Sequence, residues 1–332
     1  LTNDQIKALP STGGEADIAQ YLPVLPGIIV SGDQGGQLYI RGGSPVQNRI
    51  MIDGMTIYNP FHSIGFFSVF ETETIRSVDV LTGGFNAEYG GRISAIVDIK
   101  TREGNKKRFS GLVSASPFQA KALFEGPIKK FNPETGGSSS FILTAKHSYL
   151  DESSKIFYNY AADTTFFSFA SGDTTLADIQ DEIGLPYQYT DIYGKLSLLS
   201  GNGSKLDLFG INYNDRFDFV GIARLNWNTV GGGAQFTLVP PHSNIVIDGT
   251  VALTDYQIEL TESDGRPRRS GINNYNALLN FSYFGYRNEF KYGIEFNGFN
   301  TDFQFDNALG IRFEQQDFTT ELAGYFKYKQ QV

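Results

Sequence analysis

The stretch that decides the fold is Leu38 to Lys100, which reads LYIRGGSPVQNRIMIDGMTIYNPFHSIGFFSVFETETIRSVDVLTGGFNAEYGGRISAIVDIK. It contains short runs that are rich in Ile and Val and that end at or near glycine, a pattern typical of β-strands bounded by turns. These runs are Leu38–Arg41, Arg49–Ile52, Ile75–Leu81 and Ala95–Lys100. The sequence therefore predicts a compact domain with a small sheet and glycine-containing loops. Nothing in the stretch has the spacing of a catalytic constellation.

The residues on both sides extend this stretch into one domain of mixed α/β type, Leu1–Arg108. Thr12 and Glu15 fit a capping box, which predicts a short helix that runs through Ala16, Ile18, Ala19 and Leu22. A further short strand is expected at Ile28–Val30. We expect an aliphatic core, whose members are Leu22, Ile28, Leu38, Ile40, Ile50, Ile52, Ile75, Val78, Val80, Ile96 and Val97.

After Arg108 the sequence changes character, and residues 109–332 read as about ten strands of alternating polarity. In one such segment Phe141 and Leu143 share a face, while Thr144 and Lys146 share the other. A strand pattern of this kind predicts a sheet with one apolar and one polar face.

Short and long connections alternate between these strands. The expected tight turns are Gly201–Ser204, Pro240–Asn244 and Phe284–Arg287, and the expected long loops are Leu150–Thr190, Asp215–Asn226 and Glu259–Gly271. This alternation is typical of outer-membrane β-barrels. Tyrosines near strand ends are candidates for interfacial girdles, namely Tyr149, Tyr189, Tyr193, Tyr213, Tyr256 and Tyr283. The alternative is a soluble β-sandwich or barrel, in which the same alternation marks core and solvent faces.

Composition excludes several functional classes. The 332 residues include no cysteine, which rules out disulfides, thiolate metal sites and thiol nucleophiles. The net charge of −9 argues against a nucleic-acid partner. No window approaches the roughly 18 apolar residues of a membrane helix. The chain starts at Leu1 without Met or a signal peptide, so we expect that its natural start has been removed.

The opening stretch resembles the plug of TonB-dependent outer-membrane receptors, particularly the Bacteroidota type. The matching segments are LPSTGGEADI (9–18), LPGI (25–28), residues 38–70, IRSVDVLTGGFNAEYGGRISAIVDIKTREGN (75–105) and FSGLVSASPFQAKALFEGPI (109–128). The resemblance implies a mixed α/β plug, residues 1–108, followed by antiparallel transmembrane β-barrel strands, residues 109–332. Plugged transporters of this type have 22 strands, so about ten strands indicate a partial chain.

The resemblance also implies a function and a location. It implies a receptor in the bacterial cell outer membrane that binds a scarce solute and imports it through plug movement driven by TonB, ExbB and ExbD. The TonB box that couples such plugs is not recognisable in this chain. Outer-membrane lipid, and a surface lipoprotein or other envelope subunits, are the further partners that the resemblance suggests. The alternative is a non-transporting plugged-barrel subunit of a larger outer-membrane complex.

Two sets of plug residues are candidates for function. Aromatic and polar side chains in the loops after Asp53-Gly54 and around Phe85–Gly91 are expected to face the ligand: Tyr58, Asn59, Phe61, His62, Phe66, Phe67, Phe85, Asn86 and Tyr89. The alternative is that Phe61, Phe66 and Phe67 pack the plug against the barrel wall. Arg41, Glu88 and Arg92 are candidates for ion pairs between plug and barrel, or else for surface pairs of little energetic value.

Other chemical signals are weak. His62, His147 and His242 lack the spacing of metal ligands. Gly231–Gly233 lacks the Lys-Ser/Thr of a phosphate loop and is expected to bend a strand. The acidic run Asp173–Glu182 lacks EF-hand spacing and is expected to be a solvated loop. We therefore expect no metal, no cofactor and no enzymatic activity.

Overall fold

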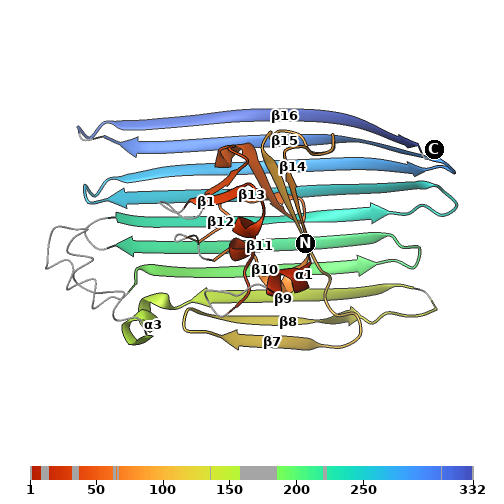
Figure 1. Ribbon diagram of the computed structural model, residues 1–332, viewed down its shortest axis with the longest axis horizontal. Helices are drawn as coiled ribbons and strands as arrows, with labels where there is room; N and C mark the ends of the chain where they lie inside the picture. Colours follow the sequence, from red (N-terminus) through yellow and green to blue (C-terminus); the bar gives the residue numbers. More distant parts are fainter. Residues whose placement is uncertain are drawn as a thin grey trace.

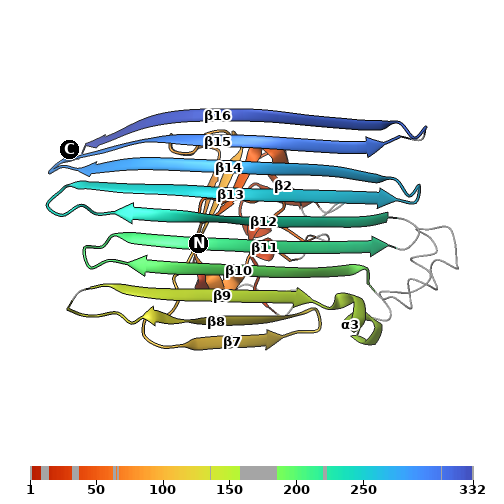
Figure 2. The ribbon, with the colours of Figure 1, turned by 180° about the vertical axis from the view of Figure 1, so that it is seen from behind.

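The computed structural model describes residues 2–8, 15–31, 37–62, 65, 67–134, 136–157, 185–219, 223–307 and 309–330. It has two parts, which we call the plug (the described residues up to 108) and the wall (the ten-stranded sheet that follows). The plug packs against one face of the wall, whose strands run side by side in sequence order (Figures 1 and 2).

The plug contains short helices and two small sheets. Its helices are α1 (Asn3–Lys7), α2 (Ile18–Tyr21) and the 3₁₀ turns η1 (Leu22–Val24), η2 (Pro45–Gln47) and η3 (Thr72–Thr74). Its strands are β1 (Ile28–Ser31), β2 (Gln37–Ile40), β3 (Asn48–Ile52), β4 (Met55–Thr56), β5 (Ile75–Thr82) and β6 (Ala95–Thr101). The central sheet has the order β4-β3-β6-β5, in which only β3 and β6 are parallel.

The sequence located β1, β2, β3, β5, β6 and their core correctly, but it did not predict the two-residue strand β4. Of the expected core residues, Val80 alone is only partly buried, because it lies toward the end of β5. The helix start was wrong: Thr12 lies outside the described residues, and Asp17 caps α2 by accepting a hydrogen bond from the backbone N–H of Ala19 (2.7 Å). Asp is as good an N-cap as Thr, so the chain held two candidates within five residues.

The wall is a meander of antiparallel strands. They are β7 (Ser110–Ala115), β8 (Gln119–Lys129), β9 (Ser138–Ser148), β10 (Tyr187–Leu199), β11 (Lys205–Phe219), β12 (Ala223–Leu238), β13 (Ile245–Glu262), β14 (Pro267–Phe284), β15 (Asn288–Asp306) and β16 (Arg312–Gln330). Helix α3 (Leu150–Phe157) follows β9. Each strand pairs with its neighbours in sequence, and β7 and β16 are the two edges of the described sheet.

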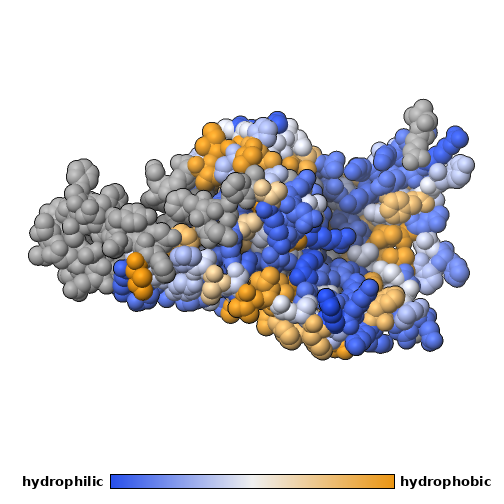
Figure 3. Space-filling model, turned by 60° about the horizontal axis from the view of Figure 1, so that its bottom comes forward, coloured by the Kyte–Doolittle hydropathy of each residue, from blue (hydrophilic) through white to orange (hydrophobic). Residues whose placement is uncertain are grey.

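The two faces of the wall are inverted relative to a soluble protein. On β9 the polar side chains of Ser140, Thr144 and Lys146 are buried against the plug, whereas Leu143 on the opposite face is 49% exposed. On β15 Glu295 is buried and its neighbour Ile294 is 57% exposed. Apolar side chains lie open on the surface of the molecule, as the space-filling view shows (Figure 3). A soluble sandwich would bury its apolar face, so this pattern is that of a transmembrane barrel wall.

The outer apolar surface forms a band that ends partway along the strands. On β13 the outward residues are apolar from Ile245 to Leu253 and polar from Asp255 onward. Nine residues at about 3.4 Å each, tilted by about 40°, give a height of roughly 20–25 Å, close to the apolar band of outer-membrane barrels. The remaining residues of β13, from Asp255 to Glu262, continue beyond this band.

Two sequence expectations about the wall were wrong. The expected long loops Asp215–Asn226 and Glu259–Gly271 are mostly strand, because β11 continues to Phe219, β12 starts at Ala223, β13 ends at Glu262 and β14 starts at Pro267. Tyr189, Tyr193 and Tyr213 are not girdle residues, because they are buried on the inner face. Tyr256 is not one either, because it packs on the inner face beside Tyr58 of the plug. Among the described residues, no helix is long and apolar enough to cross a membrane.

Candidate functional site

The candidate site is the interface between the plug and the inner face of the wall. Its positions are given relative to the two ends of the wall: the α3 end, where α3 lies and where β13 joins β14, and the opposite end, where β10 joins β11 and β16 ends (Figure 1). Hydrogen bonds and ion pairs between buried groups join the plug to the wall at both ends. Beside them, the apolar core of the plug continues onto wall residues such as Leu123, Ile142 and Phe209.

At the α3 end His62 of the plug inserts between two strands of the wall. Its Nε2 lies 2.8 Å from Oδ2 of Asp191 on β10, and its Nδ1 lies 2.9 Å from Oδ2 of Asp215 on β11. The imidazole stacks on the Tyr189 ring at 3.7 Å between centroids, and Trp227 of β12 lies on the same cluster at 5.8 Å. Burial lowers the pKa of His62, but the two carboxylates raise it by more, so the net pKa is raised.

Lys146 of β9 connects this cluster to Ser68 and, through it, to Asp17 at the start of α2. Its Nζ lies 3.1 Å from Oδ2 of Asp191 and donates a hydrogen bond to the carbonyl of Ser68 (2.8 Å). The backbone N–H of Ser68 in turn donates to Asp17 (3.0 Å), whose pKa is raised by burial. The plug segment around Ser68 is therefore fixed to both the wall and α2.

A second cluster is built on the Asp53-Gly54 turn, in the middle of the wall. Asp53 has a positive φ of 47° and accepts hydrogen bonds from the N–H (3.0 Å) and hydroxyl (2.6 Å) of Thr101. From the wall, the Tyr193 hydroxyl donates to the same carboxylate (2.9 Å) and Lys195 Nζ lies 3.4 Å away. At Gly54 a Cβ would lie 2.9 Å from Thr250, so only glycine allows the turn to approach the wall this closely.

A third cluster joins β3 and β4 to β15. Arg49 Nη1 lies 2.6 Å from Oε1 of Glu295, and both side chains are almost fully buried. Arg49 Nε also donates to Thr56 (3.3 Å), and Asn276 of β14 donates to Glu295 (3.2 Å). The carboxylate is thus held by groups from both the plug and the wall.

Further ion pairs place plug carboxylates on wall lysines. Lys121 lies 3.0 Å from Glu15 and 3.1 Å from Glu71, and Lys205 lies 2.7 Å from Glu103. Burial opposes ionisation of Glu15 and Glu103, but the hydrogen bonds and positive charges of their lysine partners lower the pKa of both carboxyls. Plug acid on wall lysine is therefore a recurring arrangement of this interface.

A cavity of about 490 Å³ separates the plug from β13 and β14 toward the α3 end. Its walls include Tyr58, Asn59 and Arg92 of the plug and Tyr256 and Ile258 of the wall. The Tyr58 hydroxyl is buried and has no hydrogen-bond partner among the described residues. Burial raises the pKa of this phenol, which therefore remains a proton donor. The cavity thus combines apolar surface with one free donor and one guanidinium.

The expected ligand-facing residues divide into groups. Phe61, His62 and Phe67 are buried against the wall, which favours packing over ligand contact and corrects the expectation that they are open to solute. Phe66 lies outside the described residues. Tyr58 and Asn59 line the cavity, and with its amide oriented to satisfy both partners Asn59 accepts from Trp227 Nε1 (3.1 Å).

The loop Phe85–Gly91 lies elsewhere. Its Glu88 contacts Lys291, near the start of β15 at the opposite end of the wall, and Gly90 lies beside Ala323 of β16. Phe85, Asn86 and Tyr89 are therefore not gathered with the residues of the cavity, contrary to the expectation of one ligand-facing surface. Tyr89 instead points to Asp98 of β6 (3.4 Å).

Of the three expected plug–wall ion-pair residues, Glu88 contacts a wall lysine, Lys291. Arg41 and Arg92 make no ion pair with the wall within the described part of the chain. Arg41 has a positive φ and lies over Gly83 and Gly27, and Arg92 donates to the carbonyl of Gly91 (2.7 Å).

The sequence reasoning missed most of the interface. It did not single out Arg49, Asp53, Lys146, Lys195 or Glu295. A signal for the wall residues was present, because a charged residue on the polar face of an alternating strand points into the lumen. The sequence analysis interpreted Asp53 only as part of the Asp53-Gly54 turn and not as a partner of the wall. The pairing of these charges depends on strand register, which the sequence does not specify.

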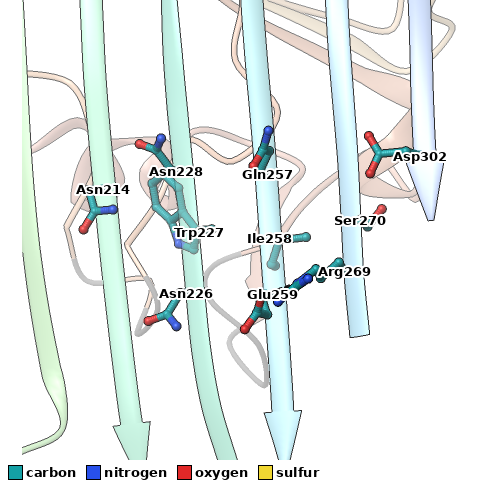
Figure 4. A pocket seen from close by; sticks show the side chains of 10 residues that line it. All are labelled: Asn214, Asn226, Trp227, Asn228, Gln257, Ile258, Glu259, Arg269, Ser270 and Asp302. Carbon is teal, nitrogen blue, oxygen red and sulfur yellow. Dashed lines mark hydrogen bonds and ion pairs between the residues drawn. The ribbon is translucent and has the colours of Figure 1, made fainter. Parts of the chain in front are cut away.

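The outer face of the wall carries a shallow pocket of about 440 Å³ beyond the apolar band (Figure 4). Polar residues from five neighbouring strands, β11 to β15, line it, including Asn214, Asn228, Gln257, Arg269 and Asp302. Polar side chains on the outer face beyond the apolar band are expected where strands extend past the membrane. No group of His, Cys, Asp and Glu in the described residues has an arrangement suited to a metal ion.

An N-terminal plug seated through buried polar contacts against an inverted β-wall defines the class of plugged outer-membrane barrels. Residues 1–96 match the family described as TonB-dependent Receptor Plug Domain. The family description applies to these residues of the plug, and the whole chain shares its fold with solved outer-membrane transporters and receptors.

Solved structures with the same fold include the ferric enterobactin receptor PfeA (TM-score 0.65, 13% identity, 100% of this chain and 55% of that one). The FrpB iron transporter of Neisseria meningitidis has a TM-score of 0.62, with 13% identity over 100% of this chain and 61% of its own. The siderophore receptor PirA of Acinetobacter baumannii has a TM-score of 0.60, with 14% identity over 100% and 58%. These identities show the fold alone, and the chain spans less than two thirds of each structure. A search of curated proteins finds no matching sequence.

Proposed function

We propose that this chain is the plug and the first ten barrel strands of an outer-membrane importer whose plug moves to admit a scarce solute. The plug match and the barrel fold support a place in the bacterial outer membrane. Energy would come from TonB with ExbB and ExbD, because the outer membrane has no nucleotide pool. Outer-membrane lipid would contact the apolar band, and a surface lipoprotein or another envelope subunit remains a possible partner in this proposal.

The observation that carries the proposal is the chemistry of the plug–wall contact. Asp53–Lys195, Arg49–Glu295 and Glu103–Lys205 are contacts that water can replace when they separate. Polar contacts of this kind reduce the apolar surface that a moving plug exposes to water. A plug whose only task was to close the barrel would gain from apolar packing instead.

The cavity beside Tyr58 and Arg92 supports a place for the solute on the α3 side of the plug. Its phenol donor and guanidinium suit an organic solute that carries acceptor or anionic groups. The structures with the same fold include receptors named for ferric enterobactin, ferric yersiniabactin and siderophores, and a transporter named for copper. We therefore propose metal chelates as the first class to test, without choosing one.

An engineered disulfide tests plug movement directly. A Cβ built on Gly90 lies 3.5 Å from Cβ of Ala323 on β16, at the lower edge of the spacing that disulfides adopt, and Gly90 has no positive φ. These 332 residues contain no cysteine, so Gly90→Cys and Ala323→Cys add the only two thiols of this part of the protein. Any cysteine elsewhere in the full-length protein is replaced by serine before the test. The probes are ⁵⁵Fe-enterobactin, heme and copper chloride, supplied to cells that express the full-length protein.

The proposal predicts that the oxidised double variant loses uptake of one probe and that reduction restores it. Gly90→Cys alone and Ala323→Cys alone should transport normally in both redox states. Uptake that is equal in the locked and reduced proteins would overturn plug movement. No protein-dependent uptake of any probe, together with envelope subunits that co-purify, would favour the non-transporting subunit instead.

A further inference from the structure

We infer that His62 is held as an imidazolium between Asp191 and Asp215, and that this cation is the latch that fastens the tip of the plug to the wall. The latch is a property of the folded chain and does not depend on which solute is transported. It makes the attachment of the plug sensitive to alkaline pH rather than to acid.

The first argument is the count of protons at the ring. Both ring nitrogens lie within hydrogen-bond distance of a carboxylate oxygen, at 2.8 and 2.9 Å. A neutral imidazole has only one N–H, so one nitrogen lone pair would face an oxygen lone pair. Two donors are available only in the doubly protonated ring, unless one carboxyl takes the proton.

The second argument concerns which group holds the proton. Lys146 Nζ lies 3.1 Å from the same Oδ2 of Asp191 that His62 contacts, so two cationic side chains can meet at this carboxylate. A protonated His62 places a positive charge between Asp191 and Asp215, and a neutral ring would remove it from a cluster whose named side chains are at most 4% exposed. Loss of one partner of a buried ion pair is strongly unfavourable.

The aromatic surroundings also favour a cation. The Tyr189 ring lies nearly parallel to the imidazole, at 3.7 Å and 11°. Trp227 lies further out at 5.8 Å and 18°. The negative face of an aromatic ring attracts a cation that is desolvated. Tyr213 is buried on the same face of β11 as Asp215, and its hydroxyl is a further polar group on this side of the wall.

The latch acts on a defined segment of the plug. Phe61 and Ser68 form an isolated bridge, and the N–H of His62 donates to the carbonyl of Phe67 (2.9 Å). Lys146 holds the carbonyl of Ser68 at the other end of this hairpin. The hairpin is thus fixed to β9, β10 and β11 by two buried cations.

The pH dependence follows from the direction of the pKa. The folded protein raises the pKa of His62 above its ordinary value, since the two carboxylates outweigh burial. Protonation therefore stabilises the attached state fully below the unfolded pKa, and this stabilisation is lost as the pH rises through the folded pKa. Mild acid leaves the latch closed, and alkali opens it.

Nitrogen NMR of the full-length protein in detergent tests the inference. With ¹⁵N-labelled histidine at pH 7.5, an ordinary imidazole of pKa about 6.5 is about 90% neutral. His62 should instead show two protonated nitrogens. A neutral tautomer of His62 at pH 7.5 would overturn the inference.

Glutamine at every other histidine of the protein, His147 and His242 among them, leaves His62 as the one labelled ring, so the test does not require that a His62 variant folds. Protease cleavage of the plug between pH 7 and 10 then tests the latch. Wild-type protein should become more susceptible as the pH rises, and His62→Gln should be susceptible throughout. His147→Gln is the matched control, because His147 lies on the outer face of β9 and bonds only Thr190 in the described structure. A wild-type profile that is flat with pH would contradict the latch.

Discussion

The inside of the plug and the contact between plug and wall are held together by different forces. Inside the plug, β3, β5 and β6 pack aliphatic side chains such as Ile52, Val78 and Ile99, all of which are at most 2% exposed. Between plug and wall the conspicuous contacts are Arg49–Glu295, Asp53–Lys195 and the His62 cluster. Some apolar contact remains, as where Met55 lies against Gly231.

The difference between the apolar plug core and the more polar plug–wall contact determines which of the two is expected to separate. Separation of two aliphatic surfaces in water costs roughly 25 cal/mol for each Å² exposed, whereas separated ions and hydrogen-bonding groups regain water. The plug is therefore expected to keep its own fold while its attachment to the wall is exchanged. The single tryptophan, Trp227, is buried on the wall beside His62 and reports this attachment by fluorescence.

The largest expected effect comes from one half of a buried ion pair. Arg49→Met leaves Glu295 buried without its cation, and loss of one partner of such a pair costs about 3–5 kcal/mol. The midpoint of plug release in urea, followed by Trp227 fluorescence, should fall sharply. Arg49→Met combined with Glu295→Met should recover much of the loss. Equal destabilisation of the single and double variants would contradict this account of the interface.

A similar loss is expected inside the plug, but with a different signature. Ile99→Ala removes a fully buried side chain from β6 and should destabilise the plug by about 2–5 kcal/mol. Because the interface is untouched, hydrogen exchange should rise within β3, β5 and β6 while contacts to the wall persist. Ile93→Ala, at a residue that is 79% exposed, is the control and should have little effect. If Ile99→Ala instead released a folded plug from the wall, the proposed difference between the plug core and the plug–wall contact would be wrong.

The sequence predicted the inside of the plug far better than its attachment. Strands β2, β3, β5 and β6 and their core followed from runs of Ile and Val closed by glycine, since burial within one short segment leaves a local pattern. The plug resemblance likewise rested on an ordered series of motifs between Leu9 and Ile128.

The attachment could not be predicted in the same way, because it joins residues far apart in the chain. Arg49 and Glu295 are 246 positions apart, and His62 and Asp215 are 153 apart. A shift of one residue in strand register would turn Glu295 to the outer face. The same limit explains Tyr189 and Tyr193, which sit near a strand end in sequence but face inward on β10.

The outer face of the wall gives a third comparison, with an intermediate effect. Val251 lies within the apolar band of β13, and Val251→Arg should destabilise folding into phospholipid vesicles by about 2–4 kcal/mol. Gln257→Arg, six residues further along the same face, lies beyond the band and should cost close to nothing. Equal costs at the two positions, measured by urea titration of folding, would show that the band does not end at Leu253.

The smallest effect is expected at Glu88 and Lys291, the most exposed of the plug–wall pairs discussed. Burial opposes ionisation of Glu88, but the hydrogen bond and charge of Lys291 lower its pKa. A lowered pKa contributes stability above the unfolded value of 4.5, and this contribution is lost as the pH falls through the folded pKa. Solvent screens the pair, so Glu88→Gln should cost at most about 1 kcal/mol at pH 7. The difference from wild type, followed by Trp227 fluorescence in urea, should vanish in acid and shrink in 1 M salt, as it should for Lys291→Met. A difference that persists in both conditions would mean that Glu88 acts through packing of the Phe85–Gly91 loop rather than through its charge.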